Sequence, residues 1–137
     1  MATIGQFMTR DLSFVTEDAS IQDAATHMYQ QRIGSLLVKH ESEFSGIVTE
    51  TDVVRAVAEQ PALIERLKVK ELMSSPIITV DRNMSLHYAR DLMADQKIRH
   101  LAVTGENGDI VGIISVRDLL AYFKTVAKEL KASEEEG

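Results

Sequence analysis

The segment GIVTETD at residues 46–52 returns as GIISVRD at residues 112–118, 66 positions later. Both segments begin with a glycine and two apolar residues, and both place an aspartate three positions after a hydroxyl residue. The likeness extends outwards, because Met28 and Met93 stand 65 positions apart and one additional residue near Asn107-Gly108 accounts for the difference. A solenoid needs about three stacked repeats. The sequence therefore predicts two copies of one unit, packed as a pseudo-two-fold pair.

Each copy predicts the same order of secondary structure. In the second copy, the β-branched residues 77–80 favour a strand, Ser85 can cap a helix over residues 86–97, and Asn107-Gly108 favours the turn of a hairpin. The hairpin strands and the start of the final helix fall at residues 98–103, 110–114 and 116. The first copy repeats this order with strands at 13–15, 35–38 and 46–48 and helices at 21–32 and 51–58. The predicted fold class is α+β, with two tandem β-α-β-β-α units.

These ranges divide the chain into four parts. The first repeat covers residues 1–58, a helical linker covers 59–68, the second repeat covers 69–130, and residues 131–137 form a tail. Pro61 suits the first position of the linker helix, because a helix does not need the N–H that proline lacks there. The tail carries three consecutive glutamates, and a short acidic terminus is typical of a solvated, disordered end.

The composition argues against several classes of protein. The chain of 137 residues has a formal net charge of −6, whereas a nucleic-acid-binding protein normally presents a concentrated basic face. It has no cysteine, which excludes a disulfide framework and a thiolate metal site. Charged residues interrupt every apolar stretch before the roughly 18 residues that a membrane span needs, and the N-terminus lacks the pattern of a signal peptide. We therefore expect a cytoplasmic protein that binds neither a membrane nor a nucleic acid.

The recurring pairs of hydroxyl and carboxylate, Thr49 with Asp52 and Ser115 with Asp118, have two interpretations. At this spacing the hydroxyl can accept from an amide of the first helical turn while the carboxylate accepts from the amide of the hydroxyl residue, which is a capping box. The same groups can bind a ligand, since a carboxylate accepts two hydrogen bonds and a vicinal diol donates two. Spacing alone favours capping, and the two functions are compatible.

No catalytic arrangement accompanies these pairs. His27, His40 and His87 have no second ligand at a spacing typical of metal sites. The chain also lacks a serine-histidine-aspartate arrangement and a glycine-rich phosphate loop. Arg99 and His100 follow one another on an expected strand, so their side chains point to opposite faces. An edge-strand charge beside a histidine at the margin of the core explains them as well as a binding function does. We expect a protein that is not an enzyme.

Three stretches carry a resemblance to a known family: the G-x-x-T/S-x-x-D end of each copy, IRHLAV at residues 98–103 and MSSPIITV at residues 73–80. Together with the repeated unit they resemble the cystathionine-β-synthase (CBS) domain family over nearly all of residues 4–130. The resemblance implies a tandem CBS pair that binds an adenosyl compound. It assigns the ribose hydroxyls to the aspartate of each copy, the sugar or α-phosphate to the Thr or Ser, and phosphate contacts to one or both of Arg99 and His100.

The ligand-binding residues that the resemblance implies come from both copies. They are Ile77, Ile78, Thr79, Arg99, His100, Ile113, Ser115 and Asp118 in the second copy, and Ser13, Thr49 and Asp52 in the first. The apolar strand residues among them would enclose the adenine. Because Gly34 and Ser35 stand where the second copy has arginine and histidine, we expect two unequal sites.

The resemblance implies regulation rather than catalysis. The expected ligand is AMP or ADP, with ATP as a further candidate, and no obligatory cofactor is expected. Similar pairs dimerise through their helices, so we expect a homodimer that answers its ligand by changing shape or its affinity for a target protein. Two alternatives stay open: a structural or interaction module whose clefts are empty, and a sensor of S-adenosylmethionine or NAD.

Overall fold

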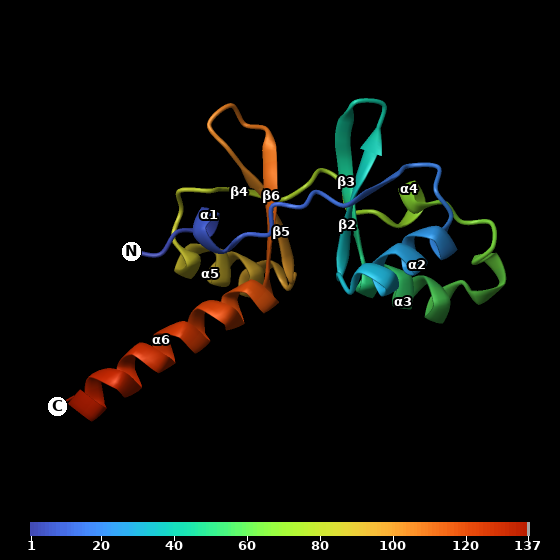
Figure 1. Cartoon of the computed structure of the whole chain (residues 1–137). Helices are drawn as coiled ribbons and strands as arrows, with labels where there is room; N and C mark the ends of the chain where they lie inside the picture. Colours follow the sequence, from blue (N-terminus) through green and yellow to red (C-terminus); the bar gives the residue numbers. More distant parts are fainter. Residues whose placement is uncertain (137) are drawn as a thin grey trace. The chain divides into compact units, whose positions relative to one another are not determined.

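The computed structural model describes residues 1–136, which form two compact units (Figure 1). Unit 1 comprises Met1–Asp11 and the chain from Thr79 onwards, and unit 2 comprises Leu12–Ile78. Each unit has a three-stranded sheet and an apolar core of its own. The fold is therefore α+β and has the two-fold internal repetition that the sequence predicts.

Unit 2 is built on a sheet of order β1-β2-β3, in which β1 is parallel to β2 and β2 is antiparallel to β3. Its elements are β1 (Phe14–Thr16), α2 (Ile21–Gln31), β2 (Ser35–His40), β3 (Glu43–Thr49), α3 (Glu50–Glu59), the 3-10 helix η1 (Pro61–Leu63) and α4 (Val69–Leu72). Alternate residues of the strands, including Leu36, Val38 and Val48, join the helices in one buried cluster. The expected linker helix is the short η1, and Pro61 occupies its first turn.

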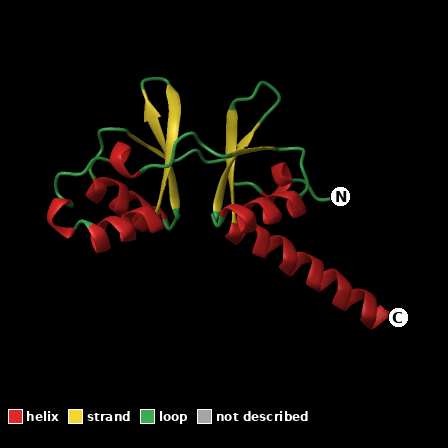
Figure 2. Cartoon of the chain, turned by 180° about the vertical axis from the view of Figure 1, so that it is seen from behind, coloured by secondary structure: helices red, strands yellow, loops and turns green. Residues whose placement is uncertain are grey.

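Unit 1 repeats this arrangement with a sheet of order β4-β5-β6. Its elements are α1 (Ile4–Phe7), β4 (Thr79–Asp81), α5 (Leu86–Gln96), β5 (His100–Thr104), β6 (Ile110–Ser115) and α6 (Val116–Glu136). The hairpin of β5 and β6 turns at Gly108, whose φ of 79° favours glycine, as the Asn-Gly signal predicts. In each unit the helices cover one face of the sheet (Figure 2).

The first residues of the chain pack in unit 1 although they belong to the first copy. We call Met1–Asp11 crossing segment 1. The N–H of Ile4 donates to the carbonyl of Met84 at 2.8 Å, and Thr9 exchanges two hydrogen bonds of 2.8 and 2.9 Å with Ile113 of β6. Ile4 and Met8 are buried in the core of unit 1. The core of the second copy is therefore incomplete without residues from the other end of the chain.

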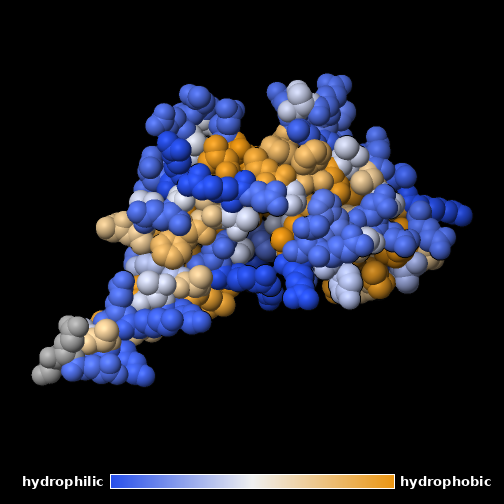
Figure 3. All heavy atoms as spheres, in the orientation of Figure 1, coloured by the Kyte–Doolittle hydropathy of each residue, from blue (hydrophilic) through white to orange (hydrophobic). Residues whose placement is uncertain are grey.

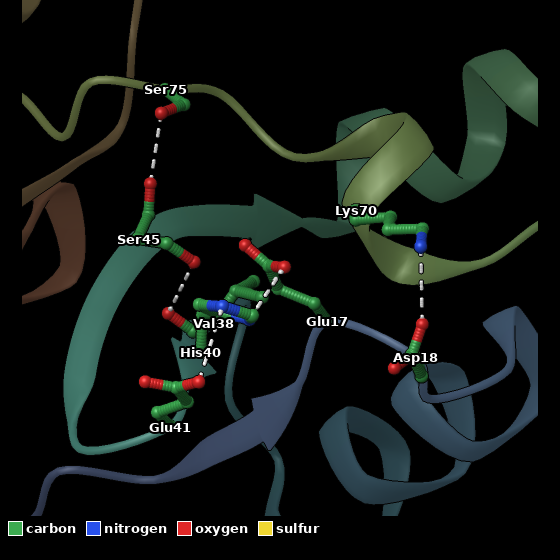
Figure 4. Close-up of polar contacts among 8 residues, drawn as sticks. All are labelled: Glu17, Asp18, Val38, His40, Glu41, Ser45, Lys70 and Ser75. Carbon is green, nitrogen blue, oxygen red and sulfur yellow. Dashed lines mark hydrogen bonds and ion pairs between the residues drawn. The ribbon is translucent and has the colours of Figure 1, made fainter.

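The opening residues of the second copy pack in unit 2 in the same way, and we call Val69–Ile78 crossing segment 2. Ser74 exchanges hydrogen bonds of 2.9 and 3.1 Å with Ile47 of β3. Polar side chains add to this attachment (Figure 4), since Ser75 Oγ donates to the carbonyl of Ser45 at 2.9 Å and Lys70 Nζ donates to Asp18 at 3.2 Å. The four-residue helices α1 and α4 lie in these segments. Sequence periodicity did not indicate them, because four residues make barely one turn.

Helices α2 and α5, which correspond to one another in the two copies, begin and end alike. Ser20 and Ser85 accept from the amides of Asp23 and Tyr88, so the predicted cap at Ser85 is confirmed. The helices end at Arg32 and at Lys97, whose φ angles of 54° and 56° lie in the left-handed region. Glycine is the usual residue at such an end, because it has no Cβ to strain the backbone.

Helix α6 is longer than the sequence predicts. We expected a disordered tail over residues 131–137, but the helix continues to Glu136, and Gly137 lies outside the described residues. Alanine and lysine favour a helix here, and Lys131 stands four positions before Glu135, a spacing that stabilises helices. Apolar side chains lie among hydrophilic ones along this helix (Figure 3). No helix within residues 1–136 is long and apolar enough to cross a membrane.

Candidate functional site

The turn between β6 and α6 holds Ser115 and Asp118 against one another. The N–H and Oγ of Ser115 both donate to Oδ2 of Asp118, at 2.8 and 3.1 Å, and the N–H of Asp118 donates back to Ser115 Oγ at 3.4 Å. This is the reciprocal pattern of a capping box. The carboxylate is thus fixed at the start of the helix, where the helix dipole favours a negative charge.

The turn between β3 and α3 has the same geometry. The N–H and Oγ1 of Thr49 donate to Oδ2 of Asp52, at 2.9 and 3.1 Å, and the N–H of Asp52 donates to Thr49 Oγ1 at 3.3 Å. Asp52 is one of the few polar residues that are buried in the described part of the chain. The capping function that the spacing predicts is therefore confirmed in both copies.

One neighbour distinguishes the two carboxylates. Nη2 of Arg55, one helical turn after Asp52, donates to Oδ1 of Asp52 at 2.9 Å. The corresponding position of α6 is Ala121, which has no polar side chain. Sequence analysis missed Arg55, although its spacing of three residues from Asp52 is a usable signal of an ion pair within a helix.

In unit 1, two more of the predicted residues stand beside the Ser115 turn. His100 is paired with Ser115 in the antiparallel register, and the carbonyl of Arg99 accepts from the N–H of Val116 at 3.0 Å. Arg99 is exposed and His100 is half-buried. Arg99 and His100 therefore lie at the strand end that is followed by the first turn of α6, which contains Asp118.

The remaining predicted residues of unit 1 lie further along the same sheet. Thr79 is opposite Ala102 in the parallel pair, and Ala102 is opposite Ile113 in the antiparallel pair. Ile113 is also the residue that pairs with crossing segment 1. Six of the predicted residues thus share unit 1. Thr79, His100, Ile113 and Ser115 are in its sheet, Arg99 directly precedes β5, and Asp118 is in α6.

Ile77 and Ile78 lie in the other unit. The strand that the sequence predicts at residues 77–80 begins only at Thr79, where pairing with β5 starts, and the two isoleucines close crossing segment 2 in unit 2. Unit 2 also holds Ser13, whose carbonyl accepts from the N–H of Leu37 at 3.1 Å. The structure therefore groups Ser13, Ile77 and Ile78 with Thr49 and Asp52.

Within residues 1–136, no group of three or more histidine, aspartate or glutamate side chains has a geometry that could hold a metal ion. What both units share is a buried or half-buried carboxylate held by a hydroxyl residue at a strand-to-helix turn. Such a turn fixes acceptor atoms at a strand end, and a carboxylate accepts hydrogen bonds from hydroxyl groups. The fold and its site define a protein with two related α+β units that present matched polar turns.

A comparison with known sequences shows the family to which the chain belongs. The family model for the CBS domain matches twice, at residues 4–59 and 69–125, and the chain belongs to the CBS domain family. It is 31% identical over 119 residues to the CBS domain-containing protein YhcV of Bacillus subtilis, an alignment that covers 87% of this chain and 84% of that protein.

Solved structures show the same fold. A CBS-domain containing protein from Agrobacterium tumefaciens superposes with a TM-score of 0.82 at 32% identity, covering 88% of this chain and 93% of that chain. A conserved protein from Pyrococcus horikoshii gives a TM-score of 0.80 at 33% identity, with 88% and 91% covered. The resemblance drawn from the residues is therefore confirmed.

Proposed function

We propose that this chain is a regulatory module that binds the adenine nucleotides AMP and ADP, with ATP as a further ligand, and that it catalyses no reaction. The observation that carries the proposal is the pair of hydroxyl and carboxylate turns, one in each unit, each holding a carboxylate at a helix start. The ligand's ribose is assigned to Asp52 and Asp118, and its sugar or α-phosphate to Thr49 and Ser115.

The capping hydrogen bonds leave acceptor positions for a ribose. A carboxylate offers about four lone-pair positions, and the Ser115 bonds to Asp118 use Oδ2. A cis-diol presents two O–H donors for the remaining acceptor positions, and such charge-assisted hydrogen bonds are stronger than neutral ones. Capping therefore prepares the carboxylate for binding, because it fixes the side chain before the ligand arrives.

Arg99 and His100 supply the positive charge that a phosphate needs. A nucleoside monophosphate carries close to two negative charges, and the chain itself has a formal net charge of −6. A guanidinium forms two parallel hydrogen bonds with a phosphate, and an imidazole adds a charge that depends on pH. We assign these two residues to the phosphate. The adenine is assigned to Thr79 and Ile113 of unit 1 and to Ser13, Ile77 and Ile78 of unit 2.

Two complexes with this fold support an adenosyl ligand. CBSX2 in complex with AMP has a TM-score of 0.77 at 23% identity, and the CBS domain pair of MJ0100 in complex with 5'-methylthioadenosine and S-adenosyl-L-methionine has one of 0.81 at 19% identity. The likeness at these identities is one of fold. All three ligands contain an adenine attached to a ribose with free 2'- and 3'-hydroxyls, and the ribose contacts assigned above apply to each.

Exposed apolar residues at matched helix positions support a homodimer. Val54 of α3 corresponds to Leu120 of α6, Val57 corresponds to Phe123, and all four side chains are exposed. Helix faces of this kind associate with one another because apolar surface leaves water. We propose that a second copy covers them, and that the ligand acts on an unidentified target protein through this assembly.

Isothermal titration calorimetry with AMP, ADP, ATP, adenosine, S-adenosylmethionine and NAD tests the proposal, with GMP as the control. We expect heat of binding and a rise in melting temperature with AMP and none with GMP, because a ligand that binds only the folded state raises its stability. Binding of S-adenosylmethionine in preference to AMP would contradict the assignment of the phosphate residues, and a preference for NAD would contradict the proposed ligands AMP and ADP.

A second candidate function is that of a structural or interaction module without a ligand. The observation in its favour is that both carboxylates already take part in complete capping boxes. This candidate predicts that no adenosyl compound changes the melting temperature, and that replacing Asp118 affects stability alone.

A further inference from the structure

The proposed function treats Asp52 and Asp118 as equivalent, but the structure gives them different partners. Arg55 Nη2 lies 2.9 Å from Oδ1 of Asp52, and the Asp52 side chain is 8% exposed. Ala121 occupies the same place relative to Asp118. We propose that Arg55 is an internal competitor for the ribose in unit 2, and that unit 1 therefore has the higher affinity for a nucleoside. The inference rests on the proposed function and concerns the inequality of its two sites.

The competition follows from the acceptor positions of the carboxylate. Thr49 uses Oδ2 of Asp52 twice, through its N–H and its Oγ1, and Arg55 uses Oδ1. A ribose diol needs two acceptor positions, and of the roughly four that a carboxylate offers, three are already occupied. The diol must therefore displace the guanidinium or bind through one hydroxyl only.

The ion pair has the features of a persistent contact. Both residues stand on α3, three positions apart, so the helix itself brings the two groups together without ordering a loop. The buried carboxylate has lost most of its water, and a buried carboxylate needs a compensating partner. The Arg55 side chain is 51% exposed, so the guanidinium can leave at modest cost. The contact is thus strong enough to compete with a ligand and weak enough to be displaced.

Arg55 could also favour a nucleotide, because its guanidinium attracts a phosphate. A cation close to the ribose site would strengthen the binding of AMP through its phosphate. Adenosine has no phosphate, and therefore it reports only the competition for the carboxylate. We accordingly choose adenosine as the probe and AMP as the second ligand.

The first experiment transfers the contact to unit 1. In an Asp52→Ala background, which leaves only the Asp118 site, Ala121→Arg places a guanidinium one turn after Asp118, and Ala121→Gln is the matched uncharged control. Ala121 is exposed, so both variants should fold, and thermal unfolding verifies this. We expect Ala121→Arg to weaken adenosine binding about three- to fivefold, the range of a partly exposed ion pair, and Ala121→Gln to leave it unchanged.

The second experiment removes the contact from unit 2. In an Asp118→Ala background, we expect Arg55→Gln to strengthen adenosine binding by the same factor, about three- to fivefold. Raising the salt concentration should also strengthen adenosine binding when Arg55 is present, because salt screens the ion pair and adenosine is uncharged.

Each outcome separates this inference from the proposed function. If the unmodified chain binds AMP, but Ala121→Arg and Ala121→Gln have equal affinities for adenosine, the competition is refuted and the nucleotide function stands. Weaker adenosine binding by Arg55→Gln would also refute it, since Arg55 would then be a ligand contact. If the unmodified chain binds neither adenosine nor AMP, the proposed function fails and this inference fails with it.

Discussion

At the scale of single residues, each aspartate has a structural and a proposed functional task. Asp118 caps α6 through its hydrogen bonds with Ser115, and the same carboxylate is our proposed acceptor for the ribose. The two tasks differ in what they require. A cap needs one acceptor oxygen, whereas a diol needs two acceptors and gains from a full charge. Substitutions at this position can therefore separate them.

We predict that Asp118→Ala lowers the affinity for AMP about tenfold or more, because a charged hydrogen bond contributes about 1.5–3 kcal/mol. The lost cap should lower the free energy of unfolding by about 1 kcal/mol. Calorimetry measures the first effect and thermal unfolding the second. Asp118→Asn serves as the control, since an amide oxygen still accepts from Ser115. Full AMP affinity in a folded Asp118→Ala protein would exclude the ribose assignment.

Arg99 and His100 allow a test of the phosphate assignment. We expect Arg99→Ala and His100→Ala each to weaken AMP binding by about fivefold, equivalent to ~1 kcal/mol for a partly exposed charged contact, while adenosine binding stays unchanged. The ratio of the AMP and adenosine dissociation constants is the quantity to compare. An unaltered ratio in both variants would show that the phosphate lies elsewhere.

At the scale of secondary-structure elements, each crossing segment packs against a glycine of the neighbouring strand, Gly112 in β6 or Gly46 in β3. A Cβ at Gly112 would lie 2.6 Å from the Sδ of Met8 and 2.9 Å from the carbonyl oxygen of Thr9. Gly46 has the same relation to Met73 and Ser74, at 2.6 and 2.8 Å. Glycine is needed at these strand positions because another backbone approaches closely, not because of an unusual φ angle. The repeated glycine of the GIVTETD and GIISVRD segments thus has a packing function.

Gly112→Ala should lower the free energy of unfolding by about 1–3 kcal/mol, the usual cost of overpacking. Faster amide hydrogen exchange at Thr9 and Ile113 should accompany the loss, because the clash separates these paired backbones. Gly108→Ala is the comparison, since a Cβ there meets no atom within 4 Å and only the φ angle is strained. Slow exchange at Thr9 in a folded Gly112→Ala protein would disprove the packing function.

The left-handed ends of α2 and α5 offer a stabilising substitution. Lys97 has a φ of 56° and an exposed side chain. A left-handed residue other than glycine costs roughly 1–2 kcal/mol, and the greater freedom of glycine in the unfolded chain removes part of that gain. We expect Lys97→Gly to raise the free energy of unfolding by about 0.5–1 kcal/mol. Lys97→Ala keeps the strain and should bring no such gain in thermal unfolding.

At the scale of the whole molecule, the sequence repeats and the compact units do not coincide. The matched family regions begin at residues 4 and 69, yet crossing segment 1 completes unit 1 and crossing segment 2 completes unit 2. Each unit thus contains residues from both copies. If the second copy were expressed alone, from residue 69 onwards, the core of unit 1 would lack the buried side chains of Ile4 and Met8.

Deletion of residues 1–11 tests this exchange. We expect the deletion to destabilise unit 1 and to leave unit 2 unaffected. It removes Ile4 and Met8, which both belong to the core of unit 1, and removing one large buried apolar side chain costs about 2–5 kcal/mol. Hydrogen exchange measured by mass spectrometry should show lost protection in α5, β5 and β6 and retained protection in α2, β2 and β3. Loss confined to unit 2 would overturn the assignment of crossing segment 1.

Much of the architecture could be predicted because it depends on neighbours in the chain. The cap at Ser85, the turn at Gly108 and the order of strands and helices follow from residues a few positions apart, and local backbone preferences determine them. The hydroxyl and carboxylate turns belong to this group, because their hydrogen bonds span three residues. The prediction of a disordered acidic tail was wrong, because the alanine, lysine and glutamate residues there have high helix propensity and α6 continues to Glu136.

Sequence by itself determined the repeated unit, the α+β class and the two carboxylate turns, because their signals lie within short, periodic stretches. Only the tertiary structure decided that the opening segment of each copy packs in the other unit, that Ile77 and Ile78 belong to the unit that contains Asp52, and that the Asp52 carboxylate is buried. These facts depend on contacts between distant segments and on which side chains become buried. Such contacts arise from the packing of the whole chain, and no local pattern encodes them.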